Sequence, residues 1–533
     1  MPTARELRKF FVDRYLTVDT RTLALFRVYF GIVMFVDIAR RFPFVTMLYS
    51  NEGVLPNHFA LYAPLANPAF SFFNALSTPS EVRFFFAAGL VITAAYTVGF
   101  ATRFVQVLAF LFMTSLSCRN LFVENGGVVV TGVTAAWAMF FPLGDRWSVD
   151  AWVRSRSEGT PRPTEAAVPT AHTSLAMLGV TVQIAFIYFL NMIQKGDPTW
   201  TSGDAVHWVL WQNRIATPFT AWLRLHEPSW FSWIATRGTI VLEGTMPLLV
   251  LSPFFQRFLR PLHVLSAIAL HGGIALMMTI GPFSWSMIAL NLLLIPGDTW
   301  DRAWKWLKRR RPVNVNVHVH VPEVPNAAIP PSVATPTNAA EPPGPADASA
   351  TLVLVLRESL VAVFFTAVLL QIFHDNHYFR EWPEFLRRGP QGPMRAMILY
   401  PRLLQGWSMF ASIPRGDGSV VVDAVTSDGR HVDPLTGDPP DFEVLLHDPP
   451  GMSQLECDYY LRISNDGVKG YRENLLKFLR TYTNDHGVRR HADFRQVTVY
   501  WVTSASPPPG STKVTPGDRR VLAAWDSATE AKP

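Results

Sequence analysis

The chain has 533 residues, of which 49% are hydrophobic and only 17% charged, with 38 Phe and 17 Trp. This composition is typical of a polytopic membrane protein with a soluble part, and the length predicts more than one folded unit. The formal charge is +6, and the basic residues cluster at the ends of apolar segments. We therefore expect membrane lipid as a partner and no nucleic-acid binding. The two cysteines, Cys118 and Cys457, lie far apart in the sequence, so neither a disulfide framework nor a metal site with thiolate ligands is expected.

The first 21 residues are basic and amphipathic. Their sequence, MPTARELRKFFVDRYLTVDTR, has a late apolar run and no small-residue cleavage site, which distinguishes it from a signal peptide. We interpret residues 1–21 as a cytoplasmic lead into a membrane helix that is retained.

Nine apolar segments follow that are candidates for membrane-spanning helices. Several are shorter than the about 20 residues that a span requires, so helix tilt or a thinned bilayer would have to accommodate them. Eight lie within residues 22–300, and the ninth lies within residues 351–374. The segments are 22–39, 82–102, 104–119, 128–143, 173–194, 238–255, 261–280, 282–297 and 352–374.

Basic residues predict the orientation of these helices. With the N-terminus inside, eight crossings return the chain to the inside just before WDRAWKWLKRRRP (300–312), the densest basic cluster. The loops expected outside are poorer in basic residues, although they contain Arg40, Arg41, Arg214 and Arg224. The positive-inside rule predicts a multi-pass protein of the plasma or inner membrane with a cytoplasmic N-terminus.

Residues 301–350 are predicted to form a cytoplasmic linker, basic at first and then rich in Pro and Ala. The linker contains VNVNVHVHV (313–321), which alternates like a strand and places His318 and His320 on one face. Metal binding by these histidines is one alternative, and a solvated repeat is the simpler one.

Residues 375–510 have the pattern of a small α+β domain. The strand-like runs SVVVDAV (419–425) and RQVTVYWVT (495–503) accompany a helix-like run, VKGYRENLLKFLRTY (468–482). The ninth helix would place this domain outside the cell, and residues 511–533 are interpreted as a disordered tail. The predicted fold class is an all-α polytopic membrane domain of about eight helices plus a ninth, with a small extracytoplasmic α+β domain.

Polar residues within membrane spans are costly and are therefore functional candidates. The clearest is Lys195, at the predicted outer end of the fifth helix. An amine that loses hydration in an apolar pocket is deprotonated more easily, and a neutral lysine can act as a base. The alternative is a topology marker whose amine extends to the headgroups. The other candidates are Arg27, Asp37, Arg119, Gln183, Asn191, Glu243, His271 and Asn291.

Glu243 and His271 are predicted to share an outward-facing cavity with Lys195. A buried carboxylate requires a partner or a proton, so Glu243 either pairs with Arg27, Arg119 or His271 or takes part in proton transfer. Two glycines follow His271 and would let a helix or a ligand approach closely. A hydrogen-bonded interhelical histidine is the alternative role for His271.

Asp37 lies in the first helix, three and four residues before Arg40 and Arg41. That spacing places the carboxylate and both guanidinium groups on one face of a helix. We predict a local ion pair at this position.

The predicted outer loop, residues 196–237, is rich in tryptophan. Such residues most often mark helices that lie along the headgroups. Lining a pocket for a flat hydrophobic cofactor is the alternative. The tryptophans are Trp200, Trp208, Trp211, Trp222, Trp230 and Trp233.

Four stretches of the chain, in conserved order and spacing, resemble the HTTM domain family. This is the horizontally transferred transmembrane family, which includes the vitamin K-dependent gamma-carboxylases. The likeness covers residues 20–300 and continues in QGWSMFASIP (405–414), similar to the outer domain of bacterial members. The stretches are YSNEGVLP (49–56), PLGDRWSVDAW (142–152), YFLNMIQKGDPTWTSGDAVHWVL (188–210) and LHGGIALMMTIGPFSWSMIALNLLLIP (270–296).

The resemblance implies carboxylase-like chemistry. In the carboxylases a lysine in the segment matching QKGDPTW deprotonates reduced vitamin K, and Lys195 occupies that position. His271 corresponds to a histidine in the motif that resembles LHGGIALMMTIG, and Glu243 is the third expected catalytic residue. The expected cofactor is a reduced vitamin K or menaquinone-type quinol. Residues expected to contact it are Trp200, His207, Arg119 and Asn120.

The chain departs from the carboxylases near residue 127. Where they carry a histidine before the WSVD motif, this sequence has ENGGVVV, with Gly127; where many bacterial relatives have aspartate, it has Val128. The large lumenal region that grips the substrate propeptide has no counterpart here. One hypothesis is a carboxylase-like enzyme that modifies a secreted peptide or a small substrate. The others are a non-catalytic maturation or export factor for a secreted peptide, and a membrane scaffold or transporter.

Overall fold

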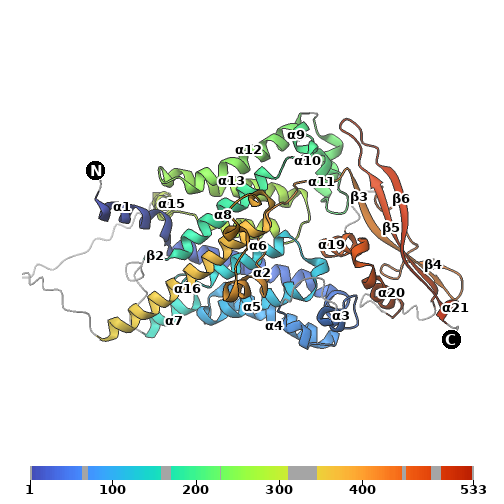
Figure 1. Ribbon diagram of the computed structural model, residues 1–533, viewed down its shortest axis with the longest axis horizontal. Helices are drawn as coiled ribbons and strands as arrows, with labels where there is room; N and C mark the ends of the chain where they lie inside the picture. Colours follow the sequence, from blue (N-terminus) through green and yellow to red (C-terminus); the bar gives the residue numbers. More distant parts are fainter. Residues whose placement is uncertain are drawn as a thin grey trace, which may run out of the picture.

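Long helices run side by side along the molecule, and a four-stranded sheet closes one end (Figure 1). The computed structural model describes residues 3–62, 70–157, 170–228, 230–309, 345–446, 452–481 and 494–530. We call the end that carries the sheet the sheet end, and the opposite end, where the N-terminus lies, the distal end (Figure 1). His318 and His320 lie outside the described residues, so metal binding there stays a prediction.

Each of the nine apolar segments expected from the sequence is a helix. They are α2 (Thr20–Arg41), α4 (Pro79–Val98), α5 (Thr102–Arg119), α6 (Gly126–Ala138), α8 (Leu175–Ile193), α12 (Phe231–Leu251), α13 (Gln256–Met277), α14 (Phe283–Leu292) and α16 (Pro345–Asp375). Within the described residues, six of them, α2, α4, α8, α12, α13 and α16, are long and apolar enough to cross a membrane. Because α6 and α14 are shorter, the number of crossings stays a prediction.

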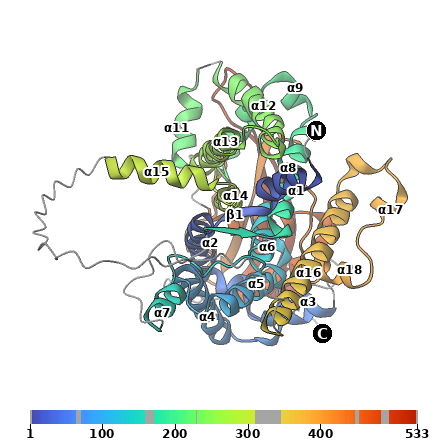
Figure 2. The ribbon, with the colours of Figure 1, turned by 90° about the vertical axis from the view of Figure 1, so that its left-hand side faces the viewer.

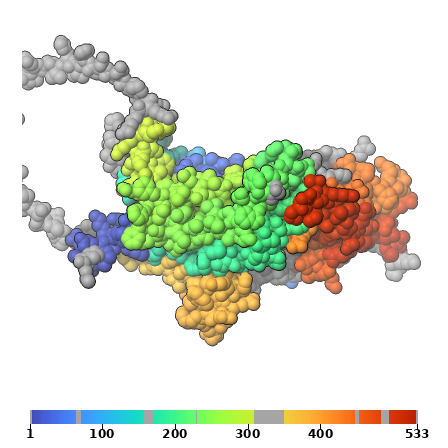
Figure 3. Space-filling view, turned by 90° about the horizontal axis from the view of Figure 1, so that it is seen from above, coloured from blue at the N-terminus to red at the C-terminus, as the bar shows by residue number. Residues whose placement is uncertain are grey.

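One long face of the bundle is formed by α12 and α13 (Figure 3). Their outward side chains are apolar, and Val241, Leu248, Leu262 and Leu265 are all more than half exposed. Large exposed apolar surfaces of this kind are not stable in water. Acyl chains of membrane lipid are therefore the natural surroundings of this face.

Capping residues mark where α8 begins and where the short helix that follows it begins. Ser174 caps the start of this helix by accepting a hydrogen bond from the Ala176 N–H, and the helix ends at Ile193. Asp197 then caps the short helix α9 (Pro198–Ser202) by accepting from the Thr199 N–H. Proline at the first position of α9 suits this reversal, because that position has no helical N–H partner to lose.

The distal end combines a short antiparallel strand pair with two amphipathic helices. β1 (Thr17–Asp19) pairs with β2 (Ala171–Thr173). α1 (Ala4–Phe11) crosses the bundle end, and α15 (Gly297–Arg309) projects from its side (Figure 2). Part of the expected amphipathic lead therefore forms the helix α1, and its cytoplasmic position stays a prediction. Residues 301–309, expected in the linker, continue α15. Its apolar residues Trp304, Trp306 and Leu307 are each about half exposed.

The tryptophan-rich segment forms α9, α10 (Ala205–Leu210) and α11 (Pro218–His226) at the sheet end. Its six tryptophans divide into two groups. The group of Trp200, Trp208 and Trp211 is buried, whereas Trp222, Trp230 and Trp233 are each more than half exposed. The exposed group fits an interfacial position, and the buried group packs inside the fold.

The sheet has the strand order β4-β3-β5-β6 and is antiparallel throughout. The predicted strands are confirmed as β3 (Gly416–Thr426) and β5 (Phe494–Ala505), and the predicted helix as α20 (Arg472–Thr481) preceded by a short 3-10 turn. The remaining elements are β4 (His431–Val432), β6 (Thr515–Asp526) and α19 (Gln454–Ile463).

The prediction of a disordered tail at 511–533 is wrong for residues 515–526, which form β6 along β5. Most β6 side chains are exposed, so its sequence, TPGDRRVLAAWD, lacks the apolar alternation of a half-buried strand. Backbone hydrogen bonds to β5 hold it as an edge strand instead, and charged residues are common on such edges. Side-chain pattern alone could not reveal this pairing.

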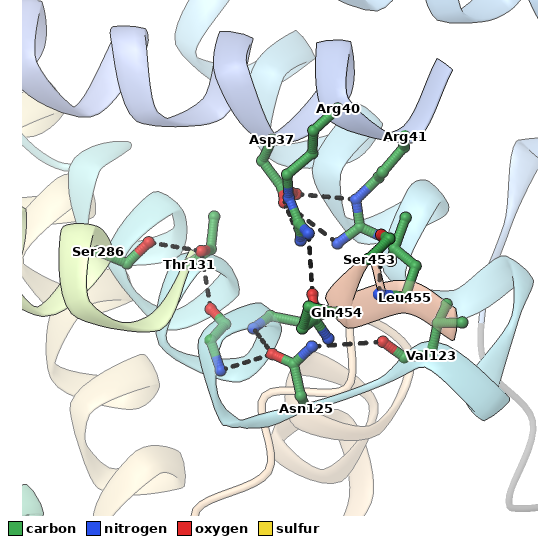
Figure 4. Close-up of polar contacts among 12 residues, drawn as sticks. Asp37, Arg40, Arg41, Val123, Asn125, Thr131, Ser286, Ser453, Gln454 and Leu455 are labelled. Carbon is green, nitrogen blue, oxygen red and sulfur yellow. Dashed lines mark hydrogen bonds and ion pairs between the residues drawn. The ribbon is translucent and has the colours of Figure 1, made fainter. Parts of the chain in front are cut away.

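Helix α19 docks the sheet domain onto the helix bundle (Figure 4). Arg40 of α2 donates to the Gln454 side chain at 2.9 Å, and Asn125, the N-cap of α6, donates to Asp458 at 2.9 Å. Ser453 caps α19 with a full capping box. The buried core runs continuously from the bundle into the sheet domain, so the two parts are joined by packing as well as by polar contacts.

Candidate functional site

Lys195 and Glu243 form a buried ion pair between α8 and α12. The Lys195 Nζ donates to the Glu243 Oε2 at 2.6 Å and to the Asn191 carbonyl, one turn back along α8, at 3.1 Å. Lys195 is 8% exposed and Glu243 9% exposed. The amine therefore points into the bundle, which is the opposite of a lysine extended to the headgroups.

The partner of Glu243 differs from the three that the sequence suggested. Arg27 instead donates to the backbone carbonyls of Leu143, Arg146 and Trp147. It therefore organises the turn that contains the PLGDRW motif. Helix packing, and not sequence proximity, selects Lys195 as the partner, because the two residues are 48 positions apart.

The segment matching QGWSMFASIP covers this ion pair. The Met409 N–H donates to the Asn191 Oδ1 at 2.8 Å, and the Trp200 Nε1 donates to the Phe410 carbonyl at 2.7 Å. The Lys195 Nζ lies 5.1 Å from the centre of the Trp200 ring, within the range of a cation–π contact. A cation held over an aromatic face, under a lid of backbone, is well shielded from water.

A cavity of about 410 Å³ opens beside this covering segment. Its wall includes Met409, Trp407 and Asn125. Because Met409 is bonded to Asn191, the cavity reaches the residues that cover Lys195. Neither Lys195 nor Glu243 is among the residues that line this cavity.

His271 belongs to a second buried group, which contains Tyr188, Asn291 and His263. The Tyr188 hydroxyl lies 2.9 Å from the His271 Nε2, and the Asn291 Nδ2 donates to that hydroxyl at 3.1 Å. The Asn291 Oδ1 lies 2.6 Å from the His263 Nε2. All four residues are at most 2% exposed. They link α8, α13 and α14 in the interior of the bundle.

The direction of each hydrogen bond in this group follows from one carbonyl. The Asn291 Nδ2 lies 2.7 Å from the Met287 carbonyl, which can only accept, and this fixes the orientation of the amide. The amide then donates to Tyr188, so the Tyr188 hydroxyl gives its own proton to the His271 Nε2. A neutral His271 consequently carries its proton on Nδ1.

The His271 Nδ1 is buried and has no hydrogen-bond partner among the described residues. A buried donor without an acceptor costs about 1 to 3 kcal/mol. On the same helix, no atom lies within 4 Å of the position that a Cβ would take at Gly272 or Gly273. The two glycines therefore leave room beside α13, as the sequence suggested.

The two groups meet on one face of α8. Tyr188, Asn191 and Lys195 follow one another at spacings of three and four residues, which place them on one side of α8. The structure thus brings Lys195 and Glu243 into contact, and the hydrogen bond between Tyr188 and His271 joins the second group to the same side of α8. Among the described contacts, His271 touches neither Lys195 nor Glu243 directly.

His207 lies in the outer segment and not against the Lys195 pair. Its Nδ1 lies 2.9 Å from Glu227, and its Nε2 lies 2.9 Å from the Pro507 carbonyl. Burial alone would lower the pKa of His207, but these two hydrogen bonds outweigh burial and raise the pKa above its ordinary value. The contacts tie α10 to the sheet domain, and a role in cofactor binding stays a prediction.

Arg119 and Asn120 end α5 and hold the loop that contains YSNEGVLP. Arg119 donates to the Leu55 carbonyl at 2.8 Å, and Asn120 donates to the Leu48 carbonyl at 2.8 Å. The Arg119 Nε and Nη1 are buried without partners in the described part of the chain. The contacts show a structural role, and their predicted part in cofactor binding stays a prediction.

The departure at Gly127 has a steric explanation. A Cβ at Gly127 would lie 2.5 Å from the backbone nitrogen of Phe283, and a Cβ at Gly126 would lie 2.7 Å from the Met409 sulfur. The Phe283 ring packs edge-on against His271, with 5.4 Å between ring centres. In this protein Phe283 fills the space that a histidine at 127 would need.

Tyr188 and His263 were not recognised as site candidates from the sequence. Tyrosine and histidine in apolar helices are common as core residues, and no motif marks these two. Helical spacing was the available signal, because Tyr188 lies seven residues before Lys195 and His263 eight before His271. Such spacing indicates a shared helix face.

Comparisons with known proteins place the helix bundle in a family. No curated protein and no solved structure gives a match. The family model of the HTTM domain matches residues 15–300, a region that contains the Lys195 and His271 groups. Together with six helices able to cross a membrane, this match shows that the chain is a multi-pass membrane protein that belongs to the HTTM family.

Proposed function

We propose that this HTTM-family protein is a membrane enzyme in which Lys195, tuned by Glu243, acts as a base on a quinol-type cofactor. In the proposal, the reaction modifies a secreted peptide by carboxylase-like chemistry. The observation that carries the proposal is the buried Lys195–Glu243 pair. A lysine directed into the bundle, against a carboxylate, is not explained by membrane topology.

The pair has the chemistry of a proton acceptor. Burial disfavours both charges, and we propose that a proton moves from Lys195 to Glu243 during the reaction, which leaves a neutral amine and a neutral acid. The neutral amine can then take a proton from a hydroxyl group and become an ammonium ion beside the resulting oxyanion. Arginine could not replace lysine in this step, because it does not lose its proton in proteins.

The surrounding residues fit a quinol at two points. Lys195 supplies the base for one hydroxyl group, and the unpartnered His271 Nδ1–H supplies a donor for an oxygen atom. A bound quinol, on oxidation by dioxygen, would supply the free energy for removing a proton from an unactivated carbon, to which carbon dioxide could then add. Trp200 and the covering segment would exclude water from the amine.

The experiment uses membranes that contain the full chain, with reduced phylloquinone or menaquinone, labelled bicarbonate and a synthetic glutamate-rich peptide. We expect quinol consumption and incorporation of label by the wild type. Lys195→Arg, which keeps the charge but cannot act as a base, should lower both by at least about a hundredfold. The matched control is Lys305→Arg, a conservative change in α15, which should leave both unchanged.

The result also distinguishes the rival role. If quinol is neither consumed nor bound, and the cellular phenotype survives Lys195→Arg and His271→Ala in correctly inserted protein, the enzyme proposal fails. A non-catalytic maturation or export factor would then be the better account. Consumption of quinol without label incorporation would contradict the carboxylation step but retain Lys195 as a base.

A further inference from the structure

A second polar cavity lies at the distal end, on the opposite side of the molecule from the sheet. Its volume is about 790 Å³. The wall is formed by the segment after α1, by the start of α13 and by the start of α15. Four arginines and four aspartates line it. They are Arg14, Arg21, Arg257, Arg260, Asp13, Asp19, Asp298 and Asp301.

The cavity is lined by equal numbers of arginines and aspartates, but they are unevenly paired. Arg21 is shared by Asp19 and Asp301, each at 2.8 Å. Arg14, Arg257 and Arg260 form no ion pair with a carboxylate within the described residues. With Asp13 and Asp298 also in the lining, this remaining set has three positive groups and two negative ones, an excess of one positive charge.

Two of these arginines carry buried donors without acceptors. Arg260 is only 5% exposed, and it donates to the backbone carbonyl of Arg14. The Nε of Arg260 and the Nε of Arg14 are buried and have no partner in the described part of the chain. Guanidinium donors that are desolvated and unpaired are costly, and an anion supplied from outside would satisfy both.

Two helices begin at the same cavity. α13 starts at Gln256 and α15 at Gly297, and both positions are part of the wall. The N-terminal end of a helix carries a partial positive charge and free N–H groups, which favour an anion. The helix ends thus add to the field of Arg14 and Arg260.

The neighbouring helices place the cavity at the depth of lipid headgroups. α1 exposes Leu7, Phe10 and Phe11, and α15 exposes Trp304 and Trp306. Amphipathic helices with aromatic and basic residues lie at the membrane interface. Both helices flank the distal end (Figure 2), so the cavity opens where phosphate groups of lipid are found.

We propose that the distal cavity binds a phosphate group through Arg14 and Arg260. The group is presented by an anionic phospholipid of the facing leaflet or by a soluble phosphate ester. Phosphate suits the site because its oxygens can accept from both guanidinium groups and from the helix ends at once. The lining acids Asp13 and Asp298 leave acceptors for a hydroxyl group of the same ligand. This inference does not depend on the proposed enzyme activity.

The experiment uses the full chain in phosphatidylcholine nanodiscs doped with phosphatidylglycerol. Native mass spectrometry counts the lipid that the protein retains after release, and we expect selective retention of phosphatidylglycerol. Arg14→Gln and Arg260→Gln should each weaken retention about tenfold, which corresponds to one charge-assisted hydrogen bond. The matched control, Arg8→Gln in α1, removes the same charge outside the cavity and should change retention less than about twofold.

A parallel arm measures thermal stabilisation of the detergent-purified protein by inorganic phosphate and glycerol 3-phosphate. Stabilisation by these anions, lost in Arg14→Gln, without retention of phosphatidylglycerol would assign the site to a soluble phosphate. Because Arg260 is deeply buried, Arg260→Lys is included as a variant that keeps the charge. Equal losses in Arg8→Gln and Arg14→Gln, or no binding of either probe by the wild type, would overturn the proposal.

Discussion

Two ion pairs of the bundle, one around Asp37 and one between Lys195 and Glu243, differ in kind. Asp37 is held by Arg40 at 2.6 Å and by Arg41 at 3.0 Å, and all three residues lie on α2. Lys195 and Glu243 lie on different segments and form a one-to-one pair at 2.6 Å. The first pair satisfies one carboxylate with two cations, whereas the second leaves each charge with a single opposite charge.

The two pairs differ in whether their cation is able to release a proton. Arginine stays protonated in proteins, so the Asp37 group can only hold structure. It holds Tyr49 through Arg41 and the sheet domain through Arg40. A lysine, unlike an arginine, is able to lose its proton in proteins, and the proposed function assigns this property to Lys195.

The largest effect is expected at Lys195. Lys195→Ala leaves the buried Glu243 carboxylate unpaired, which should lower the free energy of unfolding by about 3 to 5 kcal/mol. The double variant Lys195→Met/Glu243→Met replaces both charges with apolar groups and should recover most of that loss. Thermal unfolding in detergent measures both. A double variant as unstable as the single one would mean that the pair itself stabilises the bundle.

A smaller loss is expected at Asp37. Asp37→Asn keeps the size of the side chain but leaves Arg40 and Arg41 without a carboxylate, which should cost about 2 kcal/mol. Activity per folded molecule, measured by quinol consumption, should stay at the wild-type level. Quinol consumption by Asp37→Asn is compared with that of Lys195→Arg. A similar loss in both variants would show that the two ion pairs do not differ in function.

Tyr188→Phe should cost about 1 to 2 kcal/mol, because it removes the hydroxyl group that accepts from the Asn291 Nδ2 and lies against the His271 Nε2. The change also releases His271 from the tautomer with its proton on Nδ1. We therefore expect the rate of quinol consumption to fall by more than the loss of folded protein alone would cause. Unaltered kinetics in a folded Tyr188→Phe protein would show that the orientation of His271 is irrelevant to the reaction.

The smallest effect concerns pH at the docking helix. Burial raises the pKa of Asp458 from 3.8 to about 6, against opposing contributions from Asn125, Arg462, Arg214 and Arg40. Because the folded-state pKa lies above the unfolded value, this residue stabilises the fold fully below about pH 4. That contribution is lost as the pH rises through about 6.

Asp458→Asn removes this titration. The Tm of the variant minus the Tm of the wild type should therefore increase between about pH 4 and about pH 7. Asp428→Asn, at an exposed turn of the sheet domain, is the control and should lack that increase. A difference that stays constant over this range for Asp458→Asn would show that the docking contact does not titrate.

Much of the bundle was predictable because its determinants are local. Long apolar runs located all nine helices, with bounds that differ from the observed ones by at most seven residues. The Asp37 pair followed from a spacing of three and four residues on one helix. The strand β6 was missed because its stability comes from backbone pairing with β5 and not from an apolar pattern of its own.

Composition and short stretches of sequence were enough to predict a membrane protein, the order of its helices and its family resemblance. They also identified Lys195 as a candidate site residue, because each of these features depends on residues close together in the chain. Only the tertiary structure decided that Lys195 meets Glu243, that Asn291 and Tyr188 orient His271, and that two arginines share a cavity at the distal end. Those contacts depend on how the helices rotate and pack against one another. The spacing of residues along a single helix does not fix that rotation.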